Sequence, residues 1–162
     1  MRKYITIIFI ILSALVLNGC ANNSPYPQNQ QQVIKIQKES YFTKDGVKYK
    51  KTDIGTAVRW NNDYIVTVKH VNFTEGKEIL TPYDIKFVKS SPSDVSIPLW
   101  RVPNGNENIK IVGFNLNGNM VEHNGKDIDV YREEDNGEIN RFSTAITEGG
   151  QSGGLVLGSD GK

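Results

Sequence analysis

A serine set among glycines near the end of the chain is the pattern with the clearest chemical potential. Residues 148–154 run Glu-Gly-Gly-Gln-Ser-Gly-Gly, and the apolar run 155–157 follows. A serine nucleophile needs its hydroxyl exposed on a sharp turn, with backbone N–H groups free to bind a developing oxyanion. Glycine allows such a turn because it adopts positive φ without a Cβ clash. The same letters also fit a plain glycine-rich hairpin turn, so a base and an acid elsewhere must decide.

The chain offers two histidines as candidate bases, His70 and His123. His70 closes the hydrophobic strand-like run 64–69, whereas His123 stands beside an Asn-Gly turn among polar neighbours. A general base needs a fixed position next to the nucleophile. We therefore favour His70 over His123 as the base.

Two aspartates compete for the role of the acid that orients the base. Asp94 follows the Ser-Pro-Ser turn 91–93 and precedes an apolar run, whereas Asp84 lies within a strand-like run. Both stay candidates on local context, and the family resemblance given below favours Asp94 over its rival Asp84. The resulting chain order is His70, Asp94, Ser152. Unrelated serine hydrolases differ in this order, so it separates one fold from another.

The order argues against two other hydrolase folds. The stretch Gly150 to Gly154 also satisfies the Gly-x-Ser-x-Gly elbow of α/β-hydrolases, but that fold places its histidine after the serine. No histidine follows Ser152. A subtilisin-like order would need Asp53 or Asp63 before His70, together with alternating helices and strands, and the chain shows little sign of such helices.

Composition narrows the function classes further. The 162 residues suit one domain, and the formal net charge of +1 gives no electrostatic case for nucleic-acid binding. Cys20 is the only cysteine, so no disulfide forms within the chain. We expect no metal and no cofactor. The expected partner is a protein or peptide substrate.

The N-terminus predicts export and lipid attachment. A short basic region precedes the apolar run 5–17, which has the length of a signal-peptide core rather than a transmembrane helix. The run ends in Leu-Asn-Gly-Cys, which resembles a bacterial lipobox, so we expect a signal peptide at 1–19 and a lipidated, palmitate-bearing Cys20. Residues 20–32 are polar after the cysteine and predict a flexible tether. This implies a cell-envelope location, facing the periplasm from the outer membrane if the host has two membranes.

Short apolar runs separated by Gly, Asn and Asp clusters predict an all-β chain. Strand candidates recur from residue 33 onward, and Asp45-Gly46 is a strong hairpin signal. This spacing is typical of a barrel or a sandwich. We expect a folded domain at 33–162, in which the polar residues 103–108 link two halves.

The His-Asp-Ser order in an all-β chain resembles the chymotrypsin/trypsin-like serine peptidases of bacterial type. Residues 55–58 and 64–71 look like the strand pair that leads to the family's histidine, and 87–99 is similar to the segment that carries the acid. The resemblance implies a peptidase domain at 33–162 with a two-barrel fold, the first barrel at about 33–102 and the second at about 109–162. It also implies a serine endopeptidase that acts through an acyl-enzyme.

The resemblance assigns a role to each candidate residue. Ser152 is the nucleophile, His70 the general base, and Asp94 the group that fixes the imidazole tautomer. The backbone N–H groups of Gly150 and Ser152 form the oxyanion hole. Gln151 stands where many animal members carry an aspartate that receives a freed N-terminus, which fits a protease without that activation switch.

Two alternatives remain open from the sequence. Family members continue beyond the point that corresponds to Lys162, so we expect the second barrel to be incomplete within these residues. A trypsin-like lipoprotein that binds without turnover is the first alternative. The second is a β-rich surface lipoprotein whose Gly-Gln-Ser-Gly-Gly stretch is only a turn. The sequence predicts neither substrate specificity nor oligomeric state.

Overall fold

A computed structural model describes residues 30–162 except 73, 136 and 138. The predicted signal peptide, Cys20 and most of the predicted tether lie outside these residues. The last part of that segment belongs to the fold: Val33 N–H donates to the Gln30 carbonyl (3.0 Å), and the Gln32 side chain donates to the Ser96 carbonyl (2.8 Å). Gln32 is buried, so the folded part begins slightly before the predicted boundary.

The described chain is all-β, as predicted, and contains no helix that could cross a membrane. Alternating apolar and polar residues with Gly, Asn and Asp turns favour short antiparallel strands over helices. Its strands are β1 (Val33–Lys44), β2 (Val47–Arg59), β3 (Tyr64–Thr67), β4 (Glu78–Leu80), β5 (Lys86–Lys89), β6 (Asn108–Phe114), β7 (Met120–Glu133), β8 (Ile139–Ser143) and β9 (Leu155–Leu157).

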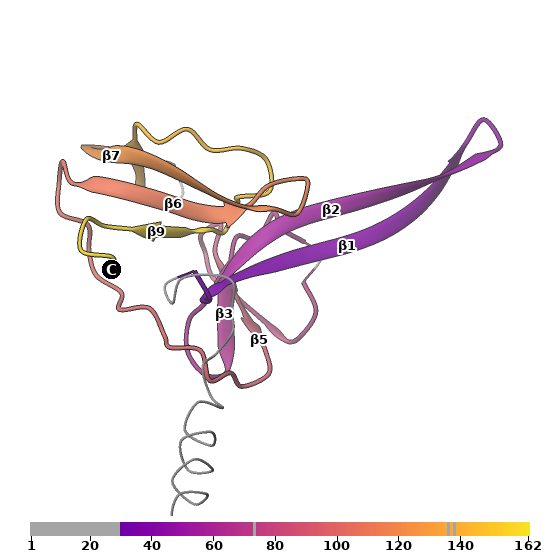
Figure 1. The fold of residues 1–162 in the computed structure, drawn as a ribbon, viewed down its shortest axis with the longest axis horizontal. Coiled ribbons are helices and arrows are strands. Elements are labelled where there is room, and N and C mark those ends of the chain that lie inside the picture. Colours follow the sequence, from indigo (N-terminus) through magenta and orange to yellow (C-terminus); the bar gives the residue numbers. More distant parts are fainter. Residues whose placement is uncertain (1–29, 73, 136, 138) are drawn as a thin grey trace, which may run out of the picture.

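These strands form two antiparallel sheets, which are joined by the irregular segment 90–107 (Figure 1). The first sheet has the order β1-β2-β3-β5-β4, and the second has the order β8-β7-β6-β9. In the first sheet Thr67 pairs with Lys86, at the end of β3 and the start of β5. The segments that follow β3 and precede β5 are therefore neighbours.

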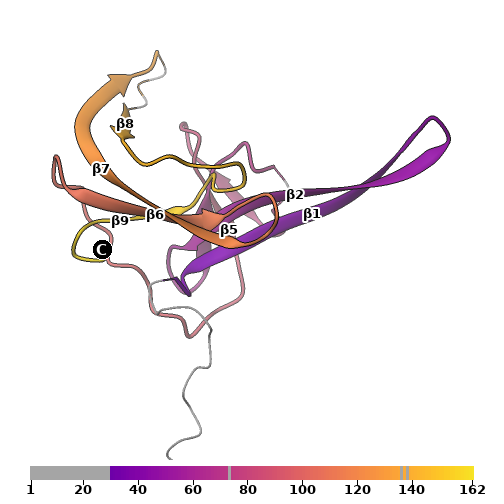
Figure 2. The ribbon, with the colours of Figure 1, turned by 45° about the horizontal axis from the view of Figure 1, so that its top comes forward.

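The β1–β2 hairpin extends beyond both sheets as a two-stranded arm, which is visible from two directions (Figures 1 and 2). Its turn residues Asp45 and Gly46 have φ of 52° and 77°, as a two-residue hairpin turn requires. The strands stay paired from Val33↔Val58 to Lys44↔Val47. The predicted hairpin is confirmed, but its strands are longer than the apolar residues alone indicate.

The core lies where the two sheets face each other. Val33 and Val58 from the first sheet pack with Val112, Phe114 and Leu155 from the second. A smaller cluster of Ala57, Ile65 and Val88 lies within the first sheet. Burial of such aliphatic side chains stabilises the fold by about 1.5–3 kcal/mol for each residue. This shared core sets the second sheet against β2, where the candidate site is built.

Candidate active site

Ser152 lies on two consecutive tight turns, 148–151 and 151–154. In each turn the fourth residue's N–H donates to the first residue's carbonyl, at 3.3 and 2.8 Å. The third residue of each turn is a glycine with positive φ, 94° at Gly150 and 85° at Gly153, as in type II turns. Ser152 is the second residue of its turn and is exposed. The sequence-based prediction of an exposed serine on a sharp glycine turn is confirmed.

Two backbone N–H groups of this loop are available to a ligand. Among the described residues, no group accepts a hydrogen bond from the N–H of Gly150 or of Ser152. Backbone N–H groups inside a folded structure normally have a partner in protein or water. The two unpaired N–H groups, which flank Gln151, can therefore bind an oxyanion.

Thr56 in β2 holds the serine loop in place. Its N–H donates to the Ser152 carbonyl (3.1 Å), and its hydroxyl donates to the Gly150 carbonyl (2.8 Å). The same hydroxyl accepts from the Phe114 N–H of β6 (2.9 Å), and the Thr56 carbonyl accepts from the Thr67 hydroxyl of β3 (2.6 Å). Thr56 is fully buried. One residue thus connects the serine loop to both sheets.

Gly153 is required by the fit of the loop against β2 and β3. A Cβ at this position would lie 2.2 Å from the Thr56 carbonyl oxygen and 2.5 Å from the Thr67 hydroxyl. Thr67 ends β3, three residues before His70. The serine loop therefore lies beside the strand that leads to the candidate base. No hydrogen bond joins Ser152 and His70 in the described part of the chain.

His70 forms a two-point contact with Asp84. The His70 ring Nδ1 is 2.6 Å from Asp84 Oδ2, and the His70 backbone N–H donates to Asp84 Oδ1 (3.2 Å). An ionised carboxylate only accepts hydrogen bonds. Nδ1 therefore donates to this carboxylate, and in the neutral ring Nε2 is left as an acceptor. Both side chains are about half exposed, 59% for His70 and 44% for Asp84.

The carboxylate that contacts His70 is Asp84, the rival, and not Asp94, which the sequence analysis favours. Asp94 is exposed in the irregular segment after β5 and makes no hydrogen bond or ion pair in the described structure. Strand β5 starts next to the end of β3 and runs away from it, to the Tyr64↔Lys89 pair. The chain therefore reaches Asp94 past the far end of the sheet. Asp84 precedes β5 and lies at the near end.

The neighbour of the serine, Gln151, closes the loop from within. Its side-chain carbonyl accepts a hydrogen bond from the Glu148 N–H (2.9 Å). Gln151 is only 4% exposed, and its Nε2 has no partner among the described residues. An internal side chain thus fixes the first turn. Because the Gln151 side chain is uncharged, this contact is a hydrogen bond and not an ion pair.

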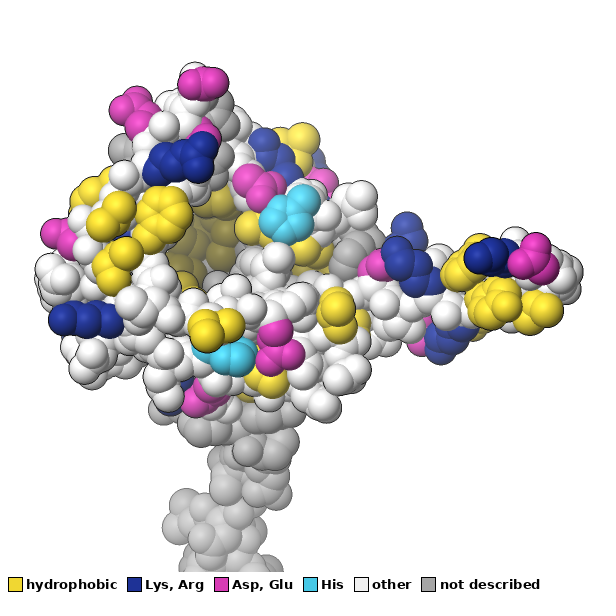
Figure 3. Space-filling model, turned by 90° about the horizontal axis from the view of Figure 1, so that it is seen from above, with side chains coloured by type: hydrophobic (Ala, Val, Ile, Leu, Met, Phe, Trp, Pro, Cys, Tyr) yellow, Lys and Arg dark blue, Asp and Glu magenta, His cyan; other side chains and the backbone are white. Residues whose placement is uncertain are grey.

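The second histidine borders the same loop, which the sequence did not indicate. His123 Nε2 lies 3.2 Å from Glu148 Oε1. Both histidines are visible on the face shown in Figure 3, near a hollow whose floor is apolar. The polar neighbours of His123 give no sign of this contact. The contact across the fold arises because β7 runs beside the loop, and no local signal predicts that.

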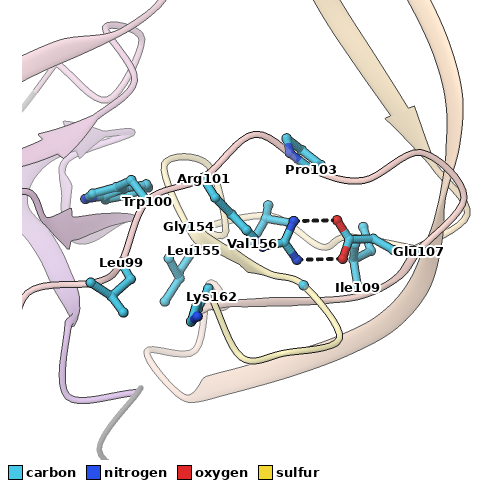
Figure 4. Close-up of a pocket in the computed structure, with 11 residues that line it drawn as sticks. Leu99, Trp100, Arg101, Pro103, Glu107, Ile109, Gly154, Leu155, Val156 and Lys162 are labelled. Atoms are coloured by element: carbon cyan, nitrogen blue, oxygen red, sulfur yellow. Dashed lines mark hydrogen bonds and ion pairs between the residues drawn. The ribbon is translucent and has the colours of Figure 1, made fainter.

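A pocket of about 250 Å³ lies away from His70, between the irregular segment and β9 (Figure 4). Arg101 forms a two-point ion pair with Glu107 (2.6 and 2.8 Å) and contacts Asp160 (3.0 Å). These bonds hold the pKa of Glu107 well below its usual value, at about 2. The group ties the connecting segment to the C-terminal turn. Among the described residues, no cluster of His, Cys, Asp and Glu is arranged to hold a metal.

Comparisons with known proteins find similar structures but no similar sequence. No family model and no curated sequence matches the chain. The structure resembles Deg5 (TM-score 0.59, 17% identity, 83% of this chain and 77% of that one) and the Rv3671c protease in an inactive form (0.58, 14%, 83% and 75%). It also resembles the apo MamO protease domain of Magnetospirillum magneticum (0.51, 13%, 67% and 72%). The chain has a trypsin-like protease fold.

In the trypsin-like fold, function must still be argued from the site, because one fold supports many activities. Sequence identities of 13–17% support the same arrangement of strands and do not assign a role to any residue. The roles of the three candidate side chains therefore depend on the geometry described above.

Proposed function

We propose that this chain is a serine endopeptidase with Ser152 as its nucleophile. The observation that carries the proposal is the exposed Ser152 on two tight turns, with the N–H groups of Gly150 and Ser152 unpaired. An oxyanion site of two backbone donors stabilises the tetrahedral intermediate of acyl transfer, and one such donor contributes about 2.7–4 kcal/mol in known cases.

In this mechanism His70 Nε2 takes the proton of the Ser152 hydroxyl as the hydroxyl attacks the peptide carbonyl. The protonated ring then gives that proton to the leaving amine, and water hydrolyses the acyl-enzyme. Asp84 replaces Asp94 in the proposal, because Asp84 accepts from Nδ1 and leaves Nε2 facing the reaction. The negative carboxylate also stabilises the imidazolium that forms.

The lack of a hydrogen bond between His70 and Ser152 among the described residues is compatible with an enzyme that has no substrate bound. Catalytic hydrogen bonds are often long or poorly aligned without substrate and tighten in the bound complex. The serine loop is fixed to Thr56, whereas the His70 side chain is 59% exposed. We therefore expect the imidazole to adjust to the loop on substrate binding.

We further propose that the enzyme is tethered to the cell envelope through Cys20. The support is the apolar run 5–17 followed by Leu-Asn-Gly-Cys. The substrates would then be envelope or extracellular proteins. Radiolabelled palmitate should be incorporated into the chain and absent from the Cys20→Ser variant.

Labelling by a fluorophosphonate tests the catalytic proposal. Such a probe phosphonylates a serine only when a base and an oxyanion site activate it. We expect one modified residue, Ser152, and no modification of the Ser152→Ala variant or of the unfolded chain. Ser143 lies in strand β8 and serves as the matched control, since Ser143→Ala should label fully. Absence of labelling in the folded full-length chain would contradict the enzyme proposal.

The second candidate function is a binding domain without turnover. One observation favours it, the lack of a hydrogen bond between His70 and Ser152 among the described residues. In that case the folded chain binds a peptide, and binding is unchanged in the Ser152→Ala variant. The labelling experiment then separates the two candidates.

A further inference from the structure

The end of the β1–β2 arm exposes a group of aromatic side chains. Tyr41, Phe42 and Tyr49 are 59%, 49% and 44% exposed, and Val47 is 53% exposed. Phe42 stacks on Tyr49 with their ring centroids 5.4 Å apart. The arm extends away from the body in both views (Figures 1 and 2). An isolated two-stranded hairpin is marginally stable in water, so this apolar end is suited to a partner.

Apolar side chains lie on both faces of the ribbon at this end. Directly paired residues share a face, and the pairs Phe42↔Tyr49 and Lys44↔Val47 alternate with Tyr41↔Lys50. Phe42, Tyr49 and Val47 therefore share one face, and Tyr41 lies on the other. A flat protein surface would cover one face of the ribbon. A medium that surrounds the end would cover both.

The arm also carries positive charge, whereas the body is acidic. Residues 33–59 contain seven Lys or Arg and three Asp or Glu, a net charge of +4. Residues 60–162 contain ten basic and fifteen acidic side chains, a net charge of −5. Near the tip, Lys48 lies 4.8 Å from the ring centroid of Tyr41. The basic side chains are thus concentrated on the same element as the exposed rings.

We propose that the tip of the β1–β2 arm docks onto an anionic lipid bilayer. Aromatic rings with a polar end favour the membrane–water interface, and lysines reach past them to anionic headgroups. A bilayer covers both faces of the tip, and its charge complements the arm while repelling the acidic body. The proposal concerns an element apart from Ser152 and does not depend on peptidase activity.

The apex of the arm limits how deeply it enters. Asp45 occupies the hairpin turn between Lys44 and Gly46. A carboxylate is disfavoured in hydrocarbon, so the tip remains at the level of the headgroups. Replacement by asparagine should therefore strengthen docking. The lysines then provide the attraction, and the rings provide the apolar contact.

A fluorophore placed at the tip tests the proposal on the full chain. Since Cys20 is the only cysteine, the Cys20→Ser, Thr43→Cys chain takes an environment-sensitive label at one position. The probe surfaces are vesicles of phosphatidylglycerol and phosphatidylcholine in equal parts, and vesicles of phosphatidylcholine alone. We expect a blue shift, and quenching by nitroxide lipids, on the anionic vesicles alone. A label at Ser159→Cys in the C-terminal turn should show neither.

Charge variants identify the source of the attraction. Lys44→Gln with Lys48→Gln should weaken docking of the tip roughly 25-fold, from the attraction of two lysines to an anionic surface. Lys77→Gln with Lys126→Gln removes two exposed body lysines and should leave docking unchanged. The local label separates docking from any anchoring by residues 1–19.

Two results would overturn the proposal. Equal emission from the tip label in buffer and on both vesicle types would show that the tip stays in water. A blue shift that grows with protein concentration without vesicles, and disappears on dilution, would assign the tip to a second copy of the chain instead.

Discussion

At the scale of single residues, the candidate site depends on which carboxylate holds His70. Asp84 contacts both the ring and the backbone N–H of His70 (2.6 and 3.2 Å). The ring contact sets the tautomer, and the backbone contact fixes the carboxylate beside the ring. Asp94 offers neither contact, although it has the more suggestive sequence context.

Replacing each aspartate in turn separates the two candidates. Asp84→Asn should reduce kcat for peptide hydrolysis by about 10⁴-fold, because an amide stabilises the wrong tautomer and lacks the negative charge. Asp94→Asn changes an exposed residue and should stay close to wild type. The measurement is a steady-state assay with a casein substrate, with circular dichroism as the check on folding. The reverse ranking of the two variants would restore Asp94 as the acid.

The sequence singles out Ser152 and His70 as candidates because each carries a local signal. Glycines flank the serine, and a hydrophobic strand ends at the histidine. Asp84 ranked second to Asp94 because its contact with His70 comes from pairing between β3 and β5, with Thr67 opposite Lys86. A signal was present all the same, since Asp84 also stands directly before an apolar strand. Extending the antiparallel register past the strand ends would have placed it near His70.

At the scale of elements, the serine loop is held by contacts that allow no side chain at its tightest point. Gly153 combines positive φ (85°) with a backbone oxygen 2.2 Å from any Cβ. The positive φ alone has a modest cost for other residues. The close approach to Thr56 adds a clash with a backbone atom that is fixed in β2.

Gly153→Ala should therefore lower the free energy of unfolding by more than about 3 kcal/mol, above the usual range for backbone strain alone. Gly161→Ala is the matched control, since its φ is also positive (75°) and no atom lies within 4 Å of its Cβ. We expect that variant to lose only about 1–2 kcal/mol. Urea unfolding followed by tryptophan fluorescence measures both. Equal losses would mean that the loop can move away from Thr56.

The arm shows where sequence patterns underestimate an element. The Asp45-Gly46 turn predicted the hairpin, yet polar residues such as Lys38 and Lys51 gave no apolar alternation. Each of these lysines still pairs with a residue of the opposite strand, because a two-stranded ribbon exposes both faces and needs no buried side. Hydrophobic periodicity reflects the burial of one face, so it gives no strand signal where neither face is buried.

At the scale of the whole molecule, ion pairs outside the site make the free energy of unfolding depend on pH. Arg101 holds the pKa of Glu107 at about 2, below its usual value of 4.5. Arg141 lowers the pKa of Asp127, and hydrogen bonds from Lys86 and Thr74 lower that of Glu78. Each carboxylate binds protons less readily in the folded chain than in the unfolded one.

These groups stabilise the fold fully above about pH 4.5, and the contribution of Glu107 is lost as the pH falls toward about 2. Glu107→Gln should be less stable at neutral pH, and its stability should fall less steeply over that window. Glu75→Gln changes an exposed carboxylate with no ion pair among the described residues and should keep the wild-type slope. Urea midpoints measured across the pH range give both slopes. Parallel slopes for Glu107→Gln and the wild type would contradict the assignment.

Thr56 has a consequence for how freely the sequence can vary. Its N–H, carbonyl and hydroxyl take part in hydrogen bonds to Ser152, Thr67, Gly150 and Phe114. Valine would keep the shape and lose the hydroxyl contacts, and most other residues would lose both. Serine alone retains the donor and the acceptor. Variation at this position is thus confined to threonine and serine, although Thr56 touches no substrate and takes no part in proton transfer.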